Sequence, residues 1–316
     1  FNYIIVFAMS SLLNVEKLFD LSKNNYSFAN DMIIIAGPTG VGKSKIAIEL
    51  AKKINGVLIN ADSVQVYKDL LLLSARPSQL DIQQVPHFLY GYVNSKINYS
   101  VVDWLLELEK TLIDIELKNK IPILVGGSGL YINAVINGLV NIPVVSQTIR
   151  NESLSRFNDV GIEKFRQINF KIDPDFVQNN HDKHRLLRAY GIFLQTKKNI
   201  SFWHKQSRVK TINKNIYPFF IKSERKLIYK KCEIRFDNML EKGAIEEVKK
   251  LYYLNIDRSL PISKSLGVKW LLNYFDNKIS FEEAVRLSKR DTRRYVKRQF
   301  TWFIHNYIPY KTLILE

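Results

Sequence analysis

Cysteine is nearly absent from this chain of 316 residues, which contains only Cys232. A single cysteine excludes an intrachain disulfide and any zinc site built on cysteines, and it is typical of a reducing compartment such as the cytoplasm. The histidines are scattered without metal-ligand spacing, so packing and hydrogen-bonding roles are expected for them. No apolar run reaches the ~18 residues of a membrane span, and no basic segment precedes the apolar stretch 1–8, so neither a span nor a signal peptide is expected.

Acidic residues are also few: the chain has 30 of them and 47 lysines and arginines, which gives a net charge of +17. An excess of this size is typical of a protein that binds a polyanion, because cations near phosphate groups release counterions. The alternative is a compositional bias, since the chain is rich in Lys, Asn and Ile. Charge alone does not decide between nucleic acid as a partner and this bias.

A phosphate-binding loop follows the apolar strand expected at 32–36. The segment matches G-x-x-x-x-G-K-[ST] at every fixed position, and apolar residues with helical spacing follow it. Glycines let backbone N–H groups turn toward phosphate oxygens, and the N-terminus of the next helix adds a partial positive charge. Lys43 supplies a full charge, and the Ser44 hydroxyl is placed to bind Mg²⁺. The motif predicts a diphosphate or polyphosphate ligand held by Gly37, Pro38, Thr39, Gly40, Val41, Gly42, Lys43 and Ser44.

Strands alternate with helices beyond this loop. Further strands are expected at 57–60, 121–125 and 215–221, and apolar residues at helical spacing predict a helix at 101–117. The alternation predicts an α/β fold: a P-loop NTPase-like parallel sheet core with a helical insertion domain and a helical C-terminal region. Ligands of such sheets bind at the carboxyl ends of the strands, where the loop, Asp62 and Ser128 should converge. Four parts are expected. Residues 1–30 form an N-terminal extension that is disordered or upstream of the true start, and 31–142 form the first part of the catalytic core. A helical insertion follows at 143–210, and 211–316 complete the core and add basic helices.

Asp62 follows the strand expected at 57–60 and begins a run in which polar residues alternate. A carboxylate at this place can accept a proton while Ser63 and Gln65 hydrogen-bond the edge of a base. The alternative is that Asp62 is the Mg²⁺ ligand of a nucleotide kinase, because a hydrophobic strand ending in Asp is also typical of that class. Spacing in the sequence leaves both interpretations open.

Basic residues cluster by helical phase in the last third of the chain, and we call this set the basic stripe. A solvated helix face usually mixes charges of both signs, whereas Asp291 is the only acid within the stripe. Aromatic residues are interleaved nearby, and the pattern favours a phosphate-binding surface over a plain solvated face. The stripe consists of Arg286, Lys289, Arg290, Arg293, Arg294, Lys297 and Arg298.

The chain from about Met32 to Tyr307 resembles the bacterial tRNA dimethylallyltransferase (tRNA isopentenyltransferase) family. The phosphate loop is shared by many families, but the Asp62 box and the block Thr292–Phe303, in this order and spacing, are specific to this one. The matching pieces are the loop at 37–44, the boxes at 62–68, 74–77, 86–87 and 125–131, and the segments 185–189, 235–240, 265–267 and 292–303.

The resemblance implies transfer of a dimethylallyl group from dimethylallyl diphosphate to N6 of the adenosine 3′ of the anticodon, in tRNAs that read codons beginning with U. It implies a Mg²⁺-dependent monomer in which Lys43, Arg235 and the loop hold the diphosphate. Asp62 would accept the N6 proton. Ser128 stands where the family usually has Thr, and its hydroxyl would hydrogen-bond N6 or fix the base. The implied tRNA-binding residues are Asp62, Ser63, Val64, Gln65, Ser128, Arg150, His184, Arg185, Leu186, Leu187 and Arg188, joined by Arg293 and Lys297 of the basic stripe.

Three positions depart from the family pattern. Gly91 replaces an acid, the segment 69–73 lacks its usual glycine, and Val268 replaces a tyrosine. Two other functions remain as alternatives. A small-molecule or nucleotide kinase on the same core predicts ATP hydrolysis or phosphoryl transfer and no use for the basic stripe. An RNA-binding protein with an inactive loop predicts that Asp62→Ala leaves all function intact.

Overall fold

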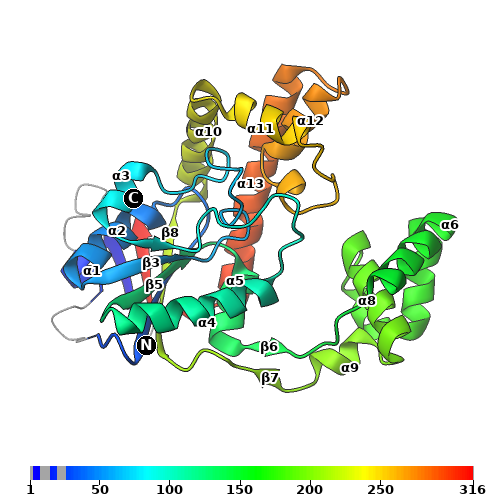
Figure 1. Ribbon diagram of the computed structural model, residues 1–316, viewed down its shortest axis with the longest axis horizontal. Helices are drawn as coiled ribbons and strands as arrows, with labels where there is room; N and C mark the ends of the chain where they lie inside the picture. The colour runs from blue at the N-terminus through cyan, green and yellow to red at the C-terminus, as the bar shows by residue number, and fades with distance from the viewer. Residues whose placement is uncertain (1–2, 8–14, 20–25, 316) are drawn as a thin grey trace. The chain divides into compact units, whose positions relative to one another are not determined.

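The computed structural model describes residues 3–7, 15–19 and 26–315, and these divide into two compact units, Phe1–Ile136 with Ile212–Glu316 and Asn137–Thr211. The first unit contains a seven-stranded sheet in the order β1-β9-β8-β2-β5-β3-β4, and every neighbouring pair in it is parallel (Figure 1). The strands are β1 (Tyr3–Phe7), β2 (Asp31–Ala36), β3 (Gly56–Asn60), β4 (His87–Phe88), β5 (Ile121–Gly126), β8 (Asn215–Ser223) and β9 (Lys311–Leu315).

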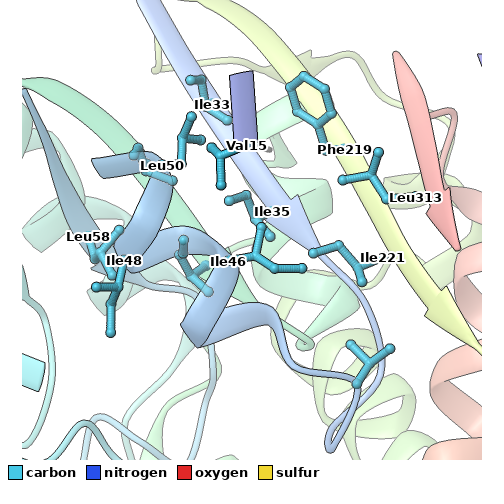
Figure 2. Packing of buried hydrophobic residues seen from close by; sticks show 14 of the residues in the cluster. Val15, Ile33, Ile35, Ile46, Ile48, Leu50, Leu58, Phe219, Ile221 and Leu313 are labelled. Carbon is cyan, nitrogen blue, oxygen red and sulfur yellow. The ribbon is translucent and has the colours of Figure 1, made fainter. Parts of the chain in front are cut away.

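Helices cover both faces of this sheet, which explains why β2 and β5 are buried along their whole length. Ile33 and Ile35 of β2 belong to one core cluster with Ile46 and Leu50 of the helix that follows the phosphate loop (Figure 2). The helices of this unit are α1 (Val15–Leu18), α2 (Lys43–Lys53), α3 (Gln79–Gln84), α4 (Val101–Leu117), α5 (Gly129–Asn137), α10 (Arg225–Glu241), α11 (Ala244–Tyr253), the 3₁₀ turn η2 (Ile262–Lys264), α12 (Val268–Phe275) and α13 (Phe281–Asn306).

Local chemistry sets several helix boundaries in this unit. Ser78 and Ser100 begin α3 and α4 with capping boxes. Each serine side chain accepts from the backbone N–H of the third helical residue, and the carboxylate of that residue accepts from the backbone N–H of the serine. In α4 the helical spacing buries Trp104, Leu108 and Leu112, outside the cluster that contains α2. The α4 side of the sheet and the α2 side therefore have separate cores, and the α/β fold expected from the sequence is confirmed.

Part of the segment expected as an extension belongs to the folded unit. Residues 3–7 form β1 and pair with β9, which is itself a strand that the sequence pattern did not indicate. Val15 and Phe19 are buried in the main core, where Phe19 packs against Phe219 of β8 with ring centroids 4.5 Å apart. These described parts correct the expectation that residues 1–30 are an extension outside the fold. Burial of Val15 and Phe19 stabilises their place in the core.

The second unit is helical, with a two-stranded antiparallel ribbon formed by its first and last elements. Phe165, Val177 and Leu186 form one small core, and Ala189, Ile192 and Ile200 form another. Gly161 interrupts its longest helix with φ of 71°. The elements are β6 (Leu139–Val140), α6 (Gln147–Ile172), α7 (Pro174–Gln178), α8 (Lys183–Thr196), α9 (Ile200–His204) and β7 (Arg208–Val209). Among the helices that the structure describes in either unit, none combines the length and apolar character that crossing a membrane requires.

Candidate active site

The phosphate loop leaves the carboxyl end of β2 and ends where α2 begins at Lys43. Gly42 is the N-cap of α2 with φ of 102°, a conformation that L side chains rarely adopt. Gly40 has φ of 79°, and a Cβ at this position would lie 2.5 Å from the Sγ atom of Cys232 on α10. Both glycines are therefore required by geometry, and the loop packs closely on α10.

Two cations in the loop region are held by neutral oxygen atoms. Lys43 donates from Nζ to the carbonyl oxygen of Pro38 at 2.8 Å, and Arg235 of α10 donates from Nη2 to Oγ1 of Thr39 at 2.8 Å. Burial lowers the pKa of the Lys43 ammonium to about 8; the negative charge of Asp62 opposes this effect and the positive charge of Arg235 adds to it. No carboxylate of a described residue forms an ion pair with either cation, so both charges remain for an anionic ligand.

Asp62 is fixed by the end of β3. The side chain of Asn60 is fully buried; it accepts from the backbone N–H of Asp62 at 2.8 Å and donates to the Asp62 carbonyl at 2.9 Å. Asp62 Oδ1 accepts from the backbone N–H of Val64 at 2.9 Å, whereas Oδ2 has no hydrogen bond to any residue that the structure describes. The free oxygen gives this carboxylate the capacity to accept a proton.

The turn Gly126–Gly129 follows β5, and we call it the acceptor turn. Within it Ser128 is nearly buried, and its Oγ accepts from the backbone N–H of Ser63 at 3.0 Å and donates to Ser63 Oγ at 3.3 Å. Ser128 therefore holds the residue next to Asp62 in place. Burial raises the pKa of the Tyr295 hydroxyl on α13, and the negative charge of Asp62 raises it further, which shows that α13 also reaches this part of the molecule.

One cavity of about 300 Å³ joins these features. It is lined by Thr39, Gly40, Gly42, Lys43 and Ser44 of the phosphate loop, and by Asp62, Gln65 and Arg235. Several expected site residues of this unit do not line it: Gly37, Pro38, Val41, Ser63, Val64, Ser128, Arg293 and Lys297. Val41 lies instead in the core under α2. Lys43, Lys45, Lys231 and Arg235 are the cations of the lining and Asp62 is its single acid, so the cavity is strongly cationic.

Comparison with known proteins decides the family. The family model described as IPP transferase matches residues 65–306. The tRNA dimethylallyltransferase of Ehrlichia ruminantium is 38% identical over 275 residues, which cover 87% of this chain and 91% of that protein. The protein of the same name from Bartonella quintana is 39% identical over 284 residues, covering 89% and 96% of the two chains. The chain belongs to the tRNA dimethylallyltransferase (IPP transferase) family.

Solved structures agree with this assignment. A tRNA isopentenylpyrophosphate transferase from Bacillus halodurans is 32% identical with a TM-score of 0.65, and the match covers 90% of both chains. A eukaryotic dimethylallyltransferase acting on tRNA is 28% identical with a TM-score of 0.72, covering 87% of this chain and 70% of that one. Membership in this family of transferases does not favour the kinase alternative.

Three residues at this candidate site were not singled out by the sequence pattern: Asn60, Tyr90 and Gln299. Asn60 holds Asp62, whereas Tyr90 and Gln299 line the cavity. The sequence did contain a sign that Gln299 is buried. It is a polar residue on the same helical face as the apolar Val296, Phe300 and Phe303. A polar side chain at a buried helical position needs hydrogen-bond partners, and those partners lie far away in the chain.

The second unit carries the other expected tRNA-binding residues of the family, Arg150 on α6 and His184–Arg188 on α8. Arg185 donates from Nη1 to Oδ1 of Asn180 at 2.7 Å. Burial lowers the pKa of the Arg188 guanidinium, and the positive charge of Arg150 lowers it further, so these two cations lie near each other. Leu186 is fully buried in the core with Phe165, so its side chain packs inside the unit and is not a contact for RNA.

The basic stripe on α13 is not a row of unpaired cations. Arg293 forms an ion pair with Glu233, and Lys289 pairs with Asp237 at 2.6 Å, both acids coming from α10. Asp291 is the only acid within the stripe itself, but acids distant in sequence lie beside it, so fewer of its cations are unpaired than the sequence indicated. Among the described residues only Lys297 and Arg298 of the stripe lack a paired acid, since Arg286 pairs with Glu283 and both Arg290 and Arg294 pair with Asp291.

The three departures from the family pattern have local structural consequences. Gly91 has φ of 61°, and a Cβ there would lie 1.4 Å from Nη1 of Arg76, so this arginine occupies the space of a side chain at position 91. Glu247 of α11 accepts hydrogen bonds from the backbone N–H groups of 71–73, which fixes the segment without its glycine. Val268 is fully buried at the start of α12.

Proposed function

We propose that this protein transfers the dimethylallyl group of dimethylallyl diphosphate to N6 of the adenosine 3′ of the anticodon, position 37, in tRNAs that read codons beginning with U. The observation that carries the proposal is the cavity that Lys43, Arg235 and Asp62 line together. Family membership supports the reaction, since relatives are named for it. A diphosphate leaving group and a proton acceptor are the two things that such a transfer needs.

The donor half of the site would hold the diphosphate. Backbone N–H groups of 40–44 and the N-terminus of α2 point toward an anion at this place. Lys43 and Arg235 would exchange their neutral oxygen partners for diphosphate oxygens, which are better acceptors because they are charged. These contacts strengthen as charge builds on the departing diphosphate, so they lower the barrier to breaking the allylic C–O bond.

Magnesium fits this cavity as a companion of the diphosphate. The Ser44 hydroxyl and the Asp62 carboxylate are among the hard oxygen donors of the lining. Among the described residues no cluster of three or more acidic, His or Cys side chains forms a metal site. Mg²⁺ commonly keeps several waters and binds through few protein oxygens and substrate phosphates. Bound Mg²⁺ would offset charge on the diphosphate, with Ser44 as its protein ligand.

The acceptor half would receive the adenine. Nitrogen N6 attacks the allylic carbon, the C–O bond to the diphosphate breaks, and the N6 proton passes to Oδ2 of Asp62, which has no hydrogen bond to a described residue. Ser128 keeps Ser63, and with it Asp62, in place. The adenosine must leave its stack to reach the cavity, which costs a few kcal/mol. We place Arg150, His184, Arg185 and Arg188 on the tRNA, with the protein acting as a monomer in the cytoplasm.

The test uses purified protein, Mg²⁺, labelled dimethylallyl diphosphate and an unmodified anticodon stem-loop with adenosine 3′ of the anticodon. Label should enter the RNA with wild-type protein, and Asp62→Asn should lower kcat by about 10² to 10⁴, as expected for loss of a general base. Asp114→Asn is the matched control, since this exposed aspartate lies on α4 and away from the cavity lining.

A second stem-loop with guanosine at the same position should take up no label. Phosphoryl transfer from ATP with no prenyl transfer by wild-type protein would overturn the proposal in favour of the kinase. Binding of the stem-loop without any transfer, and with no difference between wild type and Asp62→Asn, would favour an RNA-binding protein.

A further inference from the structure

Gln299 lies near the C-terminal end of α13 and is 5% exposed. Its Oε1 accepts from the backbone N–H of Thr39 at 2.8 Å, and its Nε2 donates to the carbonyl oxygen of Gly127 at 2.8 Å. A backbone N–H can only donate and a carbonyl can only accept, so these two partners fix the orientation of the side-chain amide. Gln299 thus connects the phosphate loop directly to the acceptor turn.

The acceptor turn is shaped to receive α13. A Cβ at Gly127 would lie 2.4 Å from Nε2 of Gln299, and a Cβ at Gly129 would lie 2.3 Å from the ring of Trp302. Neither position has space for a side chain while α13 is in place. The glycines at 127 and 129 therefore give room to two side chains of α13, of which Gln299 alone is a hydrogen-bonding link to the loop.

Each partner of Gln299 is adjacent to a group of the proposed reaction. On one side, Thr39 links Gln299 to a cation that would bind the diphosphate. The backbone N–H of Thr39 donates to Gln299, and its hydroxyl accepts a hydrogen bond from Arg235. On the other side, Gly127 precedes Ser128, which holds Ser63 next to Asp62. The hydrogen bond also occupies the N–H of Thr39, so this amide lies outside the set 40–44 whose backbone N–H groups would bind the diphosphate.

We propose that Gln299 is a positioning residue that sets the phosphate loop and the acceptor turn at a fixed separation, so that the leaving diphosphate and Asp62 face each other across the allylic carbon. This inference rests on the proposed function. Its physical basis is that errors of ~1 Å in the placement of reacting groups cost about a hundredfold in rate. A substituted side chain of matching length that cannot form these hydrogen bonds would leave the substrate contacts intact. The distance between the phosphate loop and the acceptor turn would then no longer be fixed.

The experiment compares Gln299→Met with Thr301→Ala, an exposed position on the same helix whose hydroxyl only donates to Lys297 within α13. All proteins are assayed well below their unfolding temperatures. Gln299→Met should lower kcat by about 10- to 100-fold, with KM for dimethylallyl diphosphate and for the stem-loop within about threefold of wild type. Thr301→Ala should keep wild-type values.

Two further readouts separate positioning from a general loss of structure. Amide hydrogen exchange of the loop 37–44 should rise in Gln299→Met and in no other region of the core, because the Thr39 N–H loses its acceptor. Gln299→Met combined with Ser128→Ala should cost less than the sum of the two single effects, since both act through the acceptor turn.

A wild-type kcat in folded Gln299→Met, or fully additive effects with Ser128→Ala, would overturn the role of Gln299 while leaving the proposed function intact. The loss of kcat would likewise not be positioning if hydrogen exchange rose throughout the core. A wild-type protein that binds inorganic diphosphate but transfers no prenyl group would instead overturn the proposed function itself.

Discussion

Two regions of the first unit are rich in cations, the cavity lining and the basic stripe of α13. The cations of the two regions have different hydrogen-bond partners. In the cavity, Lys43 and Arg235 are bonded to a carbonyl and a hydroxyl oxygen, which carry no net charge. In the stripe, Lys289 and Arg293 are bonded to carboxylates of α10. The first arrangement leaves positive charge for a ligand, whereas the second uses it to join two helices.

This difference matters because a cation that is already paired binds a phosphate only after its carboxylate is displaced. Exposed ion pairs contribute little to stability, typically ~0–1 kcal/mol, so their main effect here is on charge and helix orientation. The density of cations along a sequence is therefore a weak indicator of an anion site. The partner of each cation is what separates the cavity from the stripe.

The largest effect is expected from removing one cavity cation. Lys43→Met should lower kcat by about 10² to 10³, because a charge-assisted donor to the leaving group is lost where charge develops. Lys289→Met, which removes a paired cation of the stripe, is the matched control and should stay within about threefold of wild type. Steady-state transfer of labelled dimethylallyl groups measures both. Equal losses in the two variants would break the comparison.

A pH dependence should sharpen the same comparison. Because the pKa of Lys43 in the free protein is about 8, its charge is lost as the pH rises through that value, and a bound diphosphate favours the charged form. At pH 7, one unit below this pKa, most molecules carry the charge, whereas at pH 9, one unit above it, about a tenth do. Affinity for inorganic diphosphate should therefore be about tenfold weaker at pH 9 than at pH 7.

Lys43→Arg is the control for this measurement, since arginine stays protonated over the whole range while the titration of the ligand is unchanged. The ratio of wild-type to variant dissociation constants, measured calorimetrically at each pH, isolates Lys43. A ratio that stays constant between pH 7 and 9 would show that Lys43 does not titrate there.

The smallest effect is expected within the stripe itself. Arg293→Gln should change the affinity for the anticodon stem-loop by less than about twofold, because its charge is already balanced by Glu233. Lys297→Gln removes an exposed cation without a paired acid, and the salt dependence of binding should fall by up to one unit of slope. Titrations at several salt concentrations check this, and a larger effect of Arg293→Gln would mean that RNA displaces Glu233.

The sequence predicted the parts of this molecule whose signals are local. The phosphate loop is a contiguous motif, and the helix expected at 101–117 has the bounds of α4 because a capping serine and apolar periodicity mark it. The convergence of the loop, Asp62 and the acceptor turn followed from the rule that parallel strands place their carboxyl ends together. Family motifs added Arg235, which no spacing argument connects to the loop.

What the sequence did not predict depends on contacts between distant segments. Gln299 and Thr39 are 260 residues apart, and Glu233 and Arg293 are 60 apart, so neither pairing leaves a short-range pattern. Strand β9 is short and follows a long helix, and its place between β1 and β8 comes from pairing along the sheet. Such contacts are set by the packing of α10 and α13, which sequence periodicity alone does not orient.

Cys232 gives the protein a built-in chemical reporter of the phosphate loop. It is the sole thiol of the chain, it is buried, and its Sγ lies 3.7 Å from the carbonyl oxygen of Thr39. A thiol reagent can reach this sulfur only when the loop and α10 separate, so the rate of labelling measures how often the donor site opens. A bound diphosphate should slow that labelling, which makes occupancy of the site readable by mass spectrometry without turnover.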